Sequence, residues 1–543
     1  MEYNNNGYNF SGELFSRDSG TVGDKVPVTL CSERFGTELS NDFTLPEYLP
    51  EMRKLLKVNT LIAPASKYLA ASSVKLSGTV EYSILYVGGD GGVYSSVLPA
   101  EYEISAPFST DADYNANEGL AISADVYPET VTSRVTGARR LNIRSRIGAD
   151  VKVVGTVLAH GMQGIAEEEH IQKLVKSSEY CVELFGENQD IEVVDELELG
   201  GTDERYINTD CRVFVEQATA FDGYVECRGT VMLRHLVGKG CGVYGMPRKL
   251  SFSEVVELDG VSAGTPVAAW GKCASVLTST DDDEANGGRP AVTVTARIYL
   301  AARGYKKCEM SYVKDAYSTV YECDNELETY SLPQNYACGN RNMTLSETKG
   351  VDSLGGYIDG SSLEIVDVTA DAVGESVEQN ESGKYTVNGK CRFCIVYTQG
   401  SSADRTDEMW TPDYASAEIE VPFKYECAEM GEAPKAWDIQ AEAIGARARC
   451  DGESLSLGCE ISVAFGVGGS KDVTMVDSCR LLDKLEGRKK GFTICYPSSE
   501  DSLWSVSKKY RATVADTARE NGIDGAVSAD SSQALDGIRY MIV

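Results

Sequence analysis

The sequence predicts a mainly β protein, with tandem antiparallel β-sandwich-like repeat modules followed by a small β-α-α-β module. Three stretches, residues 74–89, 225–238 and 385–400, share a pattern in which a polar approach and a Gly precede an alternating strand. Alternation with a period of two places one strand face on a core and the other in water. After Cys479 the composition changes and apolar residues recur at helical spacing instead.

The repeated stretches begin similar units. Gly78, Gly229 and Gly389 stand near the start of the three strands, where we expect each Gly to mark a bulge or bend. Each unit then continues with another strand and with two strand candidates that we expect to pair. These paired candidates lie within residues 132–147, 273–300 and 439–465. Turn residues at 88–92, 281–288 and 451–452 predict hairpin connections.

These units give the expected domain organisation. The expected segments are an N-terminal segment at 1–40, three β repeats at 41–180, 181–345 and 346–480, a charged linker at 481–491 and a C-terminal module at 492–543. Helix is scarce before the C-terminal module. We expect short helices only at 45–56, with Pro50 near the first turn, and at 167–176.

Composition and charge limit the classes of partner. The chain has 543 residues and a formal charge of −32, which disfavours nucleic acids and anionic bilayers. Its N-terminus lacks the features of a secretory signal, and no run of about 18 apolar residues predicts a membrane span. We therefore expect a cytoplasmic protein whose 16 cysteines are reduced. Cys391 and Cys394 should point to opposite strand faces, which argues against a shared metal or redox pair.

Enzyme signatures are absent from the sequence. The Gly-rich residues 88–92 are followed by neither Lys-Ser/Thr nor a helix, so they do not form a P-loop. His160, His170 and His235 have no metal-ligand spacing to a Cys or carboxylate, and no Gly-x-Ser-x-Gly elbow occurs. We expect no catalytic residues, no metal and no cofactor.

The C-terminal module is expected to begin with a strand at 492–496. Residues 500–502 can cap a first helix, in which Leu503 and Val506 recur at helical spacing. Thr513 can cap a second helix, which Asn521 and Gly522 end. A closing strand at 535–543 completes the expected order.

This module resembles the LysM family. The matching positions are Asp501, Ser502, Leu503, Trp504, Ser505, Val506, Ser507, Tyr510, Val514, Asn521 and Ile523. The resemblance implies a shallow groove for N-acetylglucosamine polymers, between the loop that leads into the first helix and the loop that follows the second. The groove candidates in this chain are Glu500, Asp501, Ser502, Leu503, Asn521, Gly522 and Ile523. Glu500 replaces the family's groove Gly, which weakens the glycan interpretation, while Trp504 is best explained as a core residue.

The upstream repeats resemble SPOCS-type repeats of clostridial spore-envelope proteins. The resemblance rests on residues 45–58, on Ile84-Leu85-Tyr86 after Gly78, and on residues 138–142. The second repeat departs from it, with Leu236 and Val237 in place of the Leu-Tyr ending. Together with the LysM-like module, the order is similar to SipL-like spore-envelope proteins. That similarity implies a mother-cell protein at the forespore surface, docked to a coat-basement ATPase resembling SpoIVA.

Three functions follow from these observations. The first is a non-enzymatic morphogenetic scaffold of the spore envelope that docks to a coat-basement protein through the LysM-like module. The second is a peptidoglycan- or chitin-type glycan-binding protein that uses the same groove. The third is a self-associating envelope subunit whose cysteines cross-link it. Binding of the C-terminal module to protein or to glycan distinguishes the first two.

Overall fold

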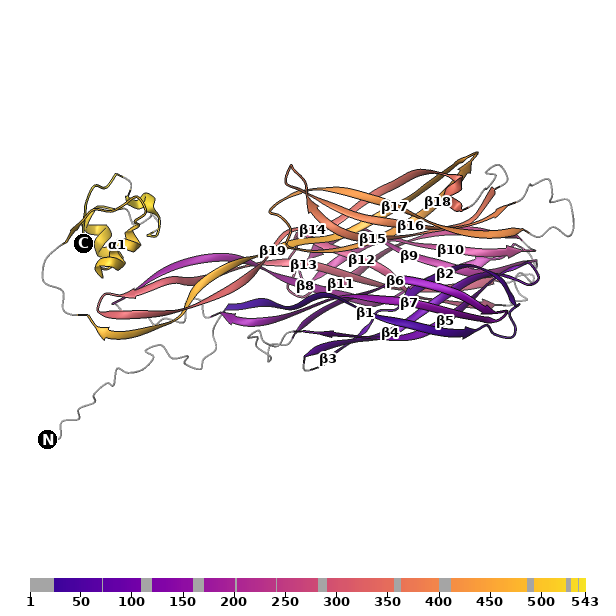
Figure 1. Cartoon of the computed structure of the whole chain (residues 1–543), viewed down its shortest axis with the longest axis horizontal. Helices are drawn as coiled ribbons and strands as arrows, with labels where there is room; N and C mark the ends of the chain where they lie inside the picture. The colour runs from indigo at the N-terminus through magenta and orange to yellow at the C-terminus, as the bar shows by residue number, and fades with distance from the viewer. Residues whose placement is uncertain are drawn as a thin grey trace, which may run out of the picture.

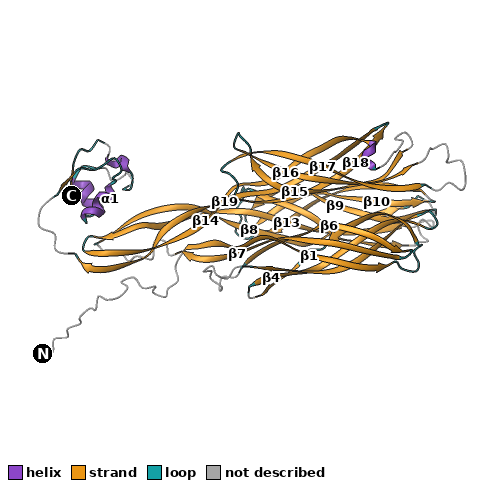
Figure 2. Cartoon of the chain, viewed as in Figure 1, coloured by secondary structure: helices purple, strands orange, loops and turns teal. Residues whose placement is uncertain are grey.

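The structure is a computed structural model and is mainly β (Figure 2). It describes residues 24–70, 72–108, 120–159, 170–200, 203–240, 242–281, 291–355, 363–399, 412–485, 493–523, 529–535 and 537–543. Within these residues, no helix is long and apolar enough to cross a membrane.

Strands from three consecutive parts of the chain form six of the seven sheets among the described residues. The first part contains β1 (Asp24–Thr44), β2 (Met52–Ile62), β3 (Ser66–Ala70), β4 (Ser73–Gly88), β5 (Val93–Pro107), β6 (Ala121–Gly137) and β7 (Arg140–Ala159). The second contains β8 (Ile171–Glu198), β9 (Glu204–Phe221), β10 (Tyr224–Lys239), β11 (Gly242–Glu257), β12 (Val267–Asp281) and β13 (Ala291–Ser318). The third contains β14 (Tyr321–Gly350), a 3-10 turn η3 (Val351–Leu354), β15 (Leu363–Gln379), β16 (Lys384–Gln399), β17 (Asp413–Met430), β18 (Ala436–Asp451) and β19 (Ser454–Lys484).

The three parts share one strand topology. In each, the last strand pairs with both the first strand and the one before it, giving the sheets β1-β7-β6, β8-β13-β12 and β14-β19-β18. The intervening strands form a second sheet, and these sheets are β2-β4-β5 with β3 added, β9-β10-β11 and β15-β16-β17. All pairings are antiparallel. Each part therefore repeats the same plan, and we call the three parts modules 1, 2 and 3.

Each module has its own apolar core between its two sheets. In module 3, Phe393 and Ile395 of β16 pack with Ile461 and Val463 of β19, and all four are fully buried. Corresponding cores in modules 1 and 2 draw on both sheets in the same way. The alternation that predicts these strands therefore reflects one face packed on the opposite sheet.

The predicted strand pairs are confirmed. The candidates in 132–147 form the β6–β7 pair, those in 273–300 lie in β12–β13, and those in 439–465 lie in β18–β19. Residues 88–92 connect β4 to β5 as a hairpin, and residues 452–453 connect β18 to β19. The predicted turn at 281–288 lies almost entirely outside the described residues.

The three repeated glycines have a more specific role than a bend. Gly78 lies opposite Tyr102 in the strand register, Gly229 opposite Phe252 and Gly389 opposite Phe423. In each pair, a β-carbon on the Gly would overlap the facing aromatic ring. On its other side, the strand that contains the Gly pairs with β9 in module 2 and with β15 in module 3. A β-bulge shifts the register of both pairings beside the Gly. Gly is therefore required because an aromatic ring covers the strand at this point.

Both helices expected before the C-terminal module are wrong. Residues 47–49 form a turn, and Met52–Ile62 is strand β2, because its residues pair with β4 across module 1. Ile171 to Lys176 begin strand β8 and pair with the end of β13. Residues 167–169 lie outside the described part. In both segments, long-range strand pairing outweighs local helix propensity.

The sheets also set module limits that differ from the expected segments. Strand β1 belongs to module 1, although residues 24–40 were expected in a separate N-terminal segment. Strands β8 and β14 likewise begin modules 2 and 3 at Ile171 and Tyr321, earlier than expected. The reason is that each module's first strand pairs with its last, a contact that sequence alternation does not reveal.

The ends of four long strands extend beyond the cores of modules 2 and 3 and form a stalk (Figure 1). The stalk contains the start of β8, the end of β13, the start of β14 and the end of β19, paired as β8–β13 and β14–β19. Strand β19 has 31 residues, which corresponds to about 100 Å at the usual rise per residue. Near the stalk tip, an apolar cluster joins the two pairs through Ile171, Val313, Val476 and Cys479.

The C-terminal module forms the predicted β-α-α-β order. Its elements are β20 (Ile494–Cys495), α1 (Leu503–Tyr510), α2 (Val514–Glu520), a 3-10 turn η6 (Ser532–Leu535) and β21 (Met541–Ile542). The predicted closing strand is shorter than expected, because only Met541–Ile542 pairs with β20. The linker is also shorter than expected, since β19 continues to Lys484. We call residues 493–543 the tail.

Candidate functional site

The tail contains both helix caps that the sequence predicts. Ser502 is the N-cap of α1, and its hydroxyl accepts a hydrogen bond from the Ser505 amide while Ser505 Oγ accepts one from the Ser502 amide. Thr513 caps α2 by accepting from the Asp516 amide. Because each cap satisfies amides that would otherwise lack partners, these short helices have defined starts.

A small apolar core holds the tail elements together. Cys495, Leu503, Val506, Leu535 and Met541 are buried in it, and the second helix packs against it through Val514 and Ala518. Leu503 and Val506, which recur at helical spacing in the sequence, therefore form the buried face of α1. Trp504 is not part of this core, although it is only 6% exposed.

Trp504 instead connects the tail to the stalk tip. Its ring packs edge-on against Tyr317 of β13, with ring centroids 4.9 Å apart, and Leu174 of β8 completes the cluster. The indole Nε1 donates a hydrogen bond to Asp315 Oδ2 at 2.8 Å. Trp504 is buried, as expected, but it is covered by the stalk strands β8 and β13 rather than by the tail core.

Further polar contacts surround Trp504. Lys508 Nζ binds both carboxylate oxygens of Asp315, at 2.6 and 2.7 Å. Tyr317 donates its hydroxyl hydrogen to the Ala512 carbonyl at 2.7 Å. Gln172 accepts from the amide of Val514, and Lys176 pairs with Asp530 at 2.6 Å. The tail is therefore attached to the stalk by one aromatic contact and several charge-assisted bonds.

Three of the predicted groove residues stabilise the loop that leads into α1. Asp501 accepts hydrogen bonds from the amide and hydroxyl of Ser498, and these bonds lower the pKa of its carboxyl. Ser502 is the buried helix cap, and Leu503 is 4% exposed in the tail core. The structure brings these residues together, but their polar atoms satisfy the tail's own backbone.

The other predicted groove residues follow α2 or remain in solvent. The Asn521 amide group donates to the carbonyls of Thr517 and Ile542, and its oxygen accepts from the Ile542 amide at 2.7 Å. Asn521 therefore joins α2 to β21. Gly522 is exposed with a φ of 63°, and Ile523 packs on the tail core. Glu500 is exposed.

The short β20–β21 sheet leaves apolar side chains uncovered. Ile494, Tyr496 and Tyr540 are 51%, 79% and 57% exposed. Cys495 and Met541 pair between them and turn inward, so Ile494 and the two tyrosines lie at the alternate, outward positions. We call these three residues the outer tail face.

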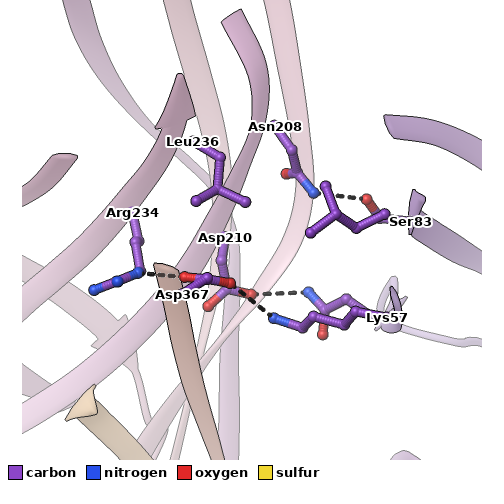
Figure 3. A pocket seen from close by; sticks show the side chains of 9 residues that line it. Lys57, Ser83, Asn208, Asp210, Arg234, Leu236 and Asp367 are labelled. Carbon is purple, nitrogen blue, oxygen red and sulfur yellow. Dashed lines mark hydrogen bonds and ion pairs between the residues drawn. The ribbon is translucent and has the colours of Figure 1, made fainter. Parts of the chain in front are cut away.

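A small polar cavity lies where the three modules meet (Figure 3). Lys57 of β2 donates to Thr369 of β15 at 2.7 Å and pairs with Asp367 at 3.7 Å. Arg234 of β10 donates to Asp367 at 2.5 Å, and Asn59 of β2 donates to Asp210 of β9 at 2.8 Å. These contacts join modules 1, 2 and 3, and we call this group the junction cluster.

Opposite charges in the junction cluster compensate each other. Burial acts to lower the pKa of Lys57, but Asp367 and Asp210 outweigh it and the pKa is raised. Burial acts to raise the pKa of Asp210, but Arg212 and Lys57 outweigh it and the pKa is lowered. Arg212 also pairs with Asp371 of β15. Because the charged groups around the cavity have protein partners, the geometry indicates a structural junction rather than a ligand site.

A second buried ionic group joins the same three modules. Arg303 of β13 pairs with Glu183 at 2.7 Å and with Asp438 of β18, while Lys152 of β7 pairs with Glu183. Burial acts to raise the pKa of Glu183, but Arg303 and Lys152 outweigh it, so the pKa is lowered. The modules are therefore fixed to one another at two places by buried charges.

The histidines and the Cys391/Cys394 pair considered in the sequence make packing and hydrogen-bond contacts within the fold where the structure describes them. His235 is fully buried between Thr209 and Asp195, and burial lowers its pKa. His170 packs beside Tyr321, whereas His160 lies outside the described residues. Cys391 is buried in the module 3 core and Cys394 is on the other strand face, as predicted. In the described part of the chain, no group of three or more His, Cys, Asp or Glu could hold a metal ion.

The stalk side of the tail attachment was not predicted from the sequence. Asp315 and Tyr317 lie in a strand whose neighbours Val313 and Ala316 are buried, and nothing in their spacing indicates a partner almost 190 residues away. The junction cluster was also missed, because its charges come from four strands in three modules. Comparison with protein-family models, curated proteins and solved structures finds no significant match.

Proposed function

We propose that this protein is a non-enzymatic scaffold of the bacterial spore envelope that presents a LysM-type tail to a coat-basement protein. The proposal includes SPOCS-type, sandwich-like repeats and a location on the mother-cell side of the forespore surface. The observation that carries it is the attachment of the tail through Trp504 and Asp315 to the tip of a long stalk. This position holds a binding module away from modules 1, 2 and 3, which we together call the body.

The body supports a scaffold role because its modules are joined by buried charges. The junction cluster and the Arg303 group each involve all three modules. Removing one partner from such a buried group is costly, which favours one fixed arrangement of the modules. A fixed body and stalk would hold the tail at a defined distance from whatever the modules contact.

The outer tail face supports a protein partner. Its two tyrosines and Ile494 remain exposed after the tail has packed on the stalk. Aromatic and aliphatic side chains that remain exposed together are typical of protein interfaces. We assign this face to the coat-basement protein.

The glycan alternative has less support from the groove residues. The side chains of Asp501 and Asn521 are occupied by hydrogen bonds within the tail. Glu500 adds an exposed side chain where a sugar would approach the backbone. The third alternative, a self-associating subunit cross-linked through cysteines, is disfavoured by the burial of most described cysteines.

Binding measurements with the full chain test the proposal. We expect the full chain to bind a purified coat-basement ATPase in biolayer interferometry, and a chain ending at Lys484 to lose that binding. Replacing both Tyr496 and Tyr540 by Ser should weaken binding at least tenfold, whereas Tyr48→Ser, at an 85% exposed position on module 1, should not. Binding of chito-oligosaccharides that Asp501→Ala abolishes would favour the glycan function instead.

A further inference from the structure

Two cysteines lie side by side at the stalk tip. Cys323 of β14 pairs with Leu481 of β19 in the strand register, and Cys479 lies two residues from Leu481, so the cysteines are diagonal neighbours on one strand face. Both pack in the cluster that joins the two strand pairs of the stalk. Both thiols are free, and each shifts the pKa of the other. The strand register and the shared cluster therefore place two free thiols next to each other on neighbouring strands.

The two thiols differ in exposure and acidity. Cys479 is 1% exposed, and the hydrogen bond with Cys323 raises its pKa well above the ordinary value. Cys323 is only partly buried, and the hydrogen bond from Cys479 lowers its pKa to about 7 despite burial, helped by Ser318 and by the tail cations Arg511 and Lys508. Cys323 is thus the nucleophilic thiolate and Cys479 the protected thiol beside it.

Another close thiol pair provides an internal comparison. Cys391 and Cys459 face each other between the two sheets of module 3, with their sulfur atoms 3.6 Å apart. Both are fully buried, and the pKa of Cys391 is raised by its bond to Cys459 and by burial. A small oxidant cannot reach this pair in the folded protein, so proximity alone does not make it reactive.

We infer that Cys323 and Cys479 form a reactive dithiol site that closes to an intramolecular disulfide when it meets a low-molecular-weight disulfide. The Cys323 thiolate attacks one sulfur of the oxidant and expels the other half as a thiolate. Cys479 then loses its proton, attacks Cys323 sulfur and expels the second half. One oxidant disulfide is reduced to two thiols while two protein thiols become one disulfide.

This site lies directly beside the tail attachment. Arg511 and Lys508 belong to the end of α1, and Lys508 also binds Asp315. The tail cations therefore act on both the attachment and the thiolate. Oxidation would place a covalent bond between β14 and β19 at the point where the stalk carries the tail.

Oxidised glutathione is the probe for the experiment. The reduced full chain is exposed to it at pH 7.5 for increasing times, quenched with an alkylating agent and analysed by peptide mass spectrometry. We expect the Cys323–Cys479 linkage to form at least tenfold faster than Cys391–Cys459. Cys479→Ser should instead accumulate glutathione on Cys323, and Cys323→Ser should form neither product.

Two results would overturn the inference. One is oxidation of Cys391–Cys459 as fast as Cys323–Cys479 in the folded chain. The other is a Cys479→Ser chain that takes up no glutathione on Cys323 while its circular dichroism spectrum matches that of the unmodified chain. Direct thiol titration with a chromogenic aromatic disulfide gives a second measure, since Cys323 should be modified first among the described cysteines.

Discussion

The indole of Trp504 donates its hydrogen to Asp315, and Asp315 lies on a strand of module 2 that begins far from the tail in the sequence. The same carboxylate binds Lys508, one turn later on α1. One stalk residue thus fixes two positions of the first tail helix. This contact therefore attaches the first tail helix directly to the stalk.

Asp315→Asn should loosen the tail without unfolding it. The substitution removes the charge that Lys508 binds, a loss of about 1–3 kcal/mol for a charge-assisted bond. Hydrogen exchange measured by mass spectrometry should rise several-fold in residues 503–514 and near Tyr317. Asp516→Asn is the matched control, because this exposed carboxylate contacts Thr513 and Arg519 of the tail rather than the stalk. Equal exchange in the two variants would contradict the attachment described above.

Gly389→Ala should destabilise module 3. The added methyl group would overlap the Phe423 ring and the Val373 carbonyl, so we expect a loss of about 1–3 kcal/mol from overpacking. Gly137→Ala, where the nearest atom is 3.7 Å away, should cost less. Urea denaturation compares the two. Partial rescue of Gly389→Ala by Phe423→Leu would show that the ring causes the loss.

Asp367→Asn should separate the modules. Lys57 and Arg234 would remain buried without their shared carboxylate, which typically costs about 3–5 kcal/mol. We expect the thermal transition to broaden or split as the modules begin to unfold independently. Asp371→Asn, whose carboxylate is 49% exposed, serves as the control and should have a smaller effect. An unchanged single transition in Asp367→Asn would show that the junction cluster does not couple the modules.

Glu442→Gln should stabilise the protein only at neutral and higher pH. Burial raises the pKa of Glu442 from 4.5 to about 7, although Arg212 and Lys272 oppose the shift. Between these pH values the folded chain retains a proton that the unfolded chain has lost, so this group's contribution to stability falls as the pH rises. Because Gln does not ionise, the variant keeps this stability as the pH rises. Its free energy of unfolding should exceed that of the unmodified chain by about 1–3 kcal/mol at pH 8 but differ little at pH 4.5. Denaturation at both pH values checks this, and an equal gain at both would exclude the ionisation as its cause.

The strands and turns were predictable because they depend on local pattern. Alternation around Gly78, Gly229 and Gly389 predicts the second sheet of each module, and Ser502 and Thr513 predict the starts of both tail helices. The pairing of β1 with β7 was not predictable, because it joins residues that are 96 to 135 positions apart.

The candidate site was predictable only in part. The sequence places Asp501 and Asn521 in two loops of the tail, and the structure shows that both hold the tail together. Neither Asp315 nor Tyr317 carried any local signal, because their role appears only when the stalk strands converge on Trp504. Buried charges such as Lys57 and Asp367 were likewise indistinguishable from surface residues until three modules were assembled around them.

The most direct test of the scaffold proposal is a binding titration of the full chain against two ligands. Isothermal titration calorimetry would compare a purified coat-basement ATPase with a hexamer of N-acetylglucosamine. We expect binding to the protein that is lost in a chain ending at Lys484, and no heat from the sugar. Binding of the sugar by the full chain, together with no binding of the coat-basement protein, would contradict the account.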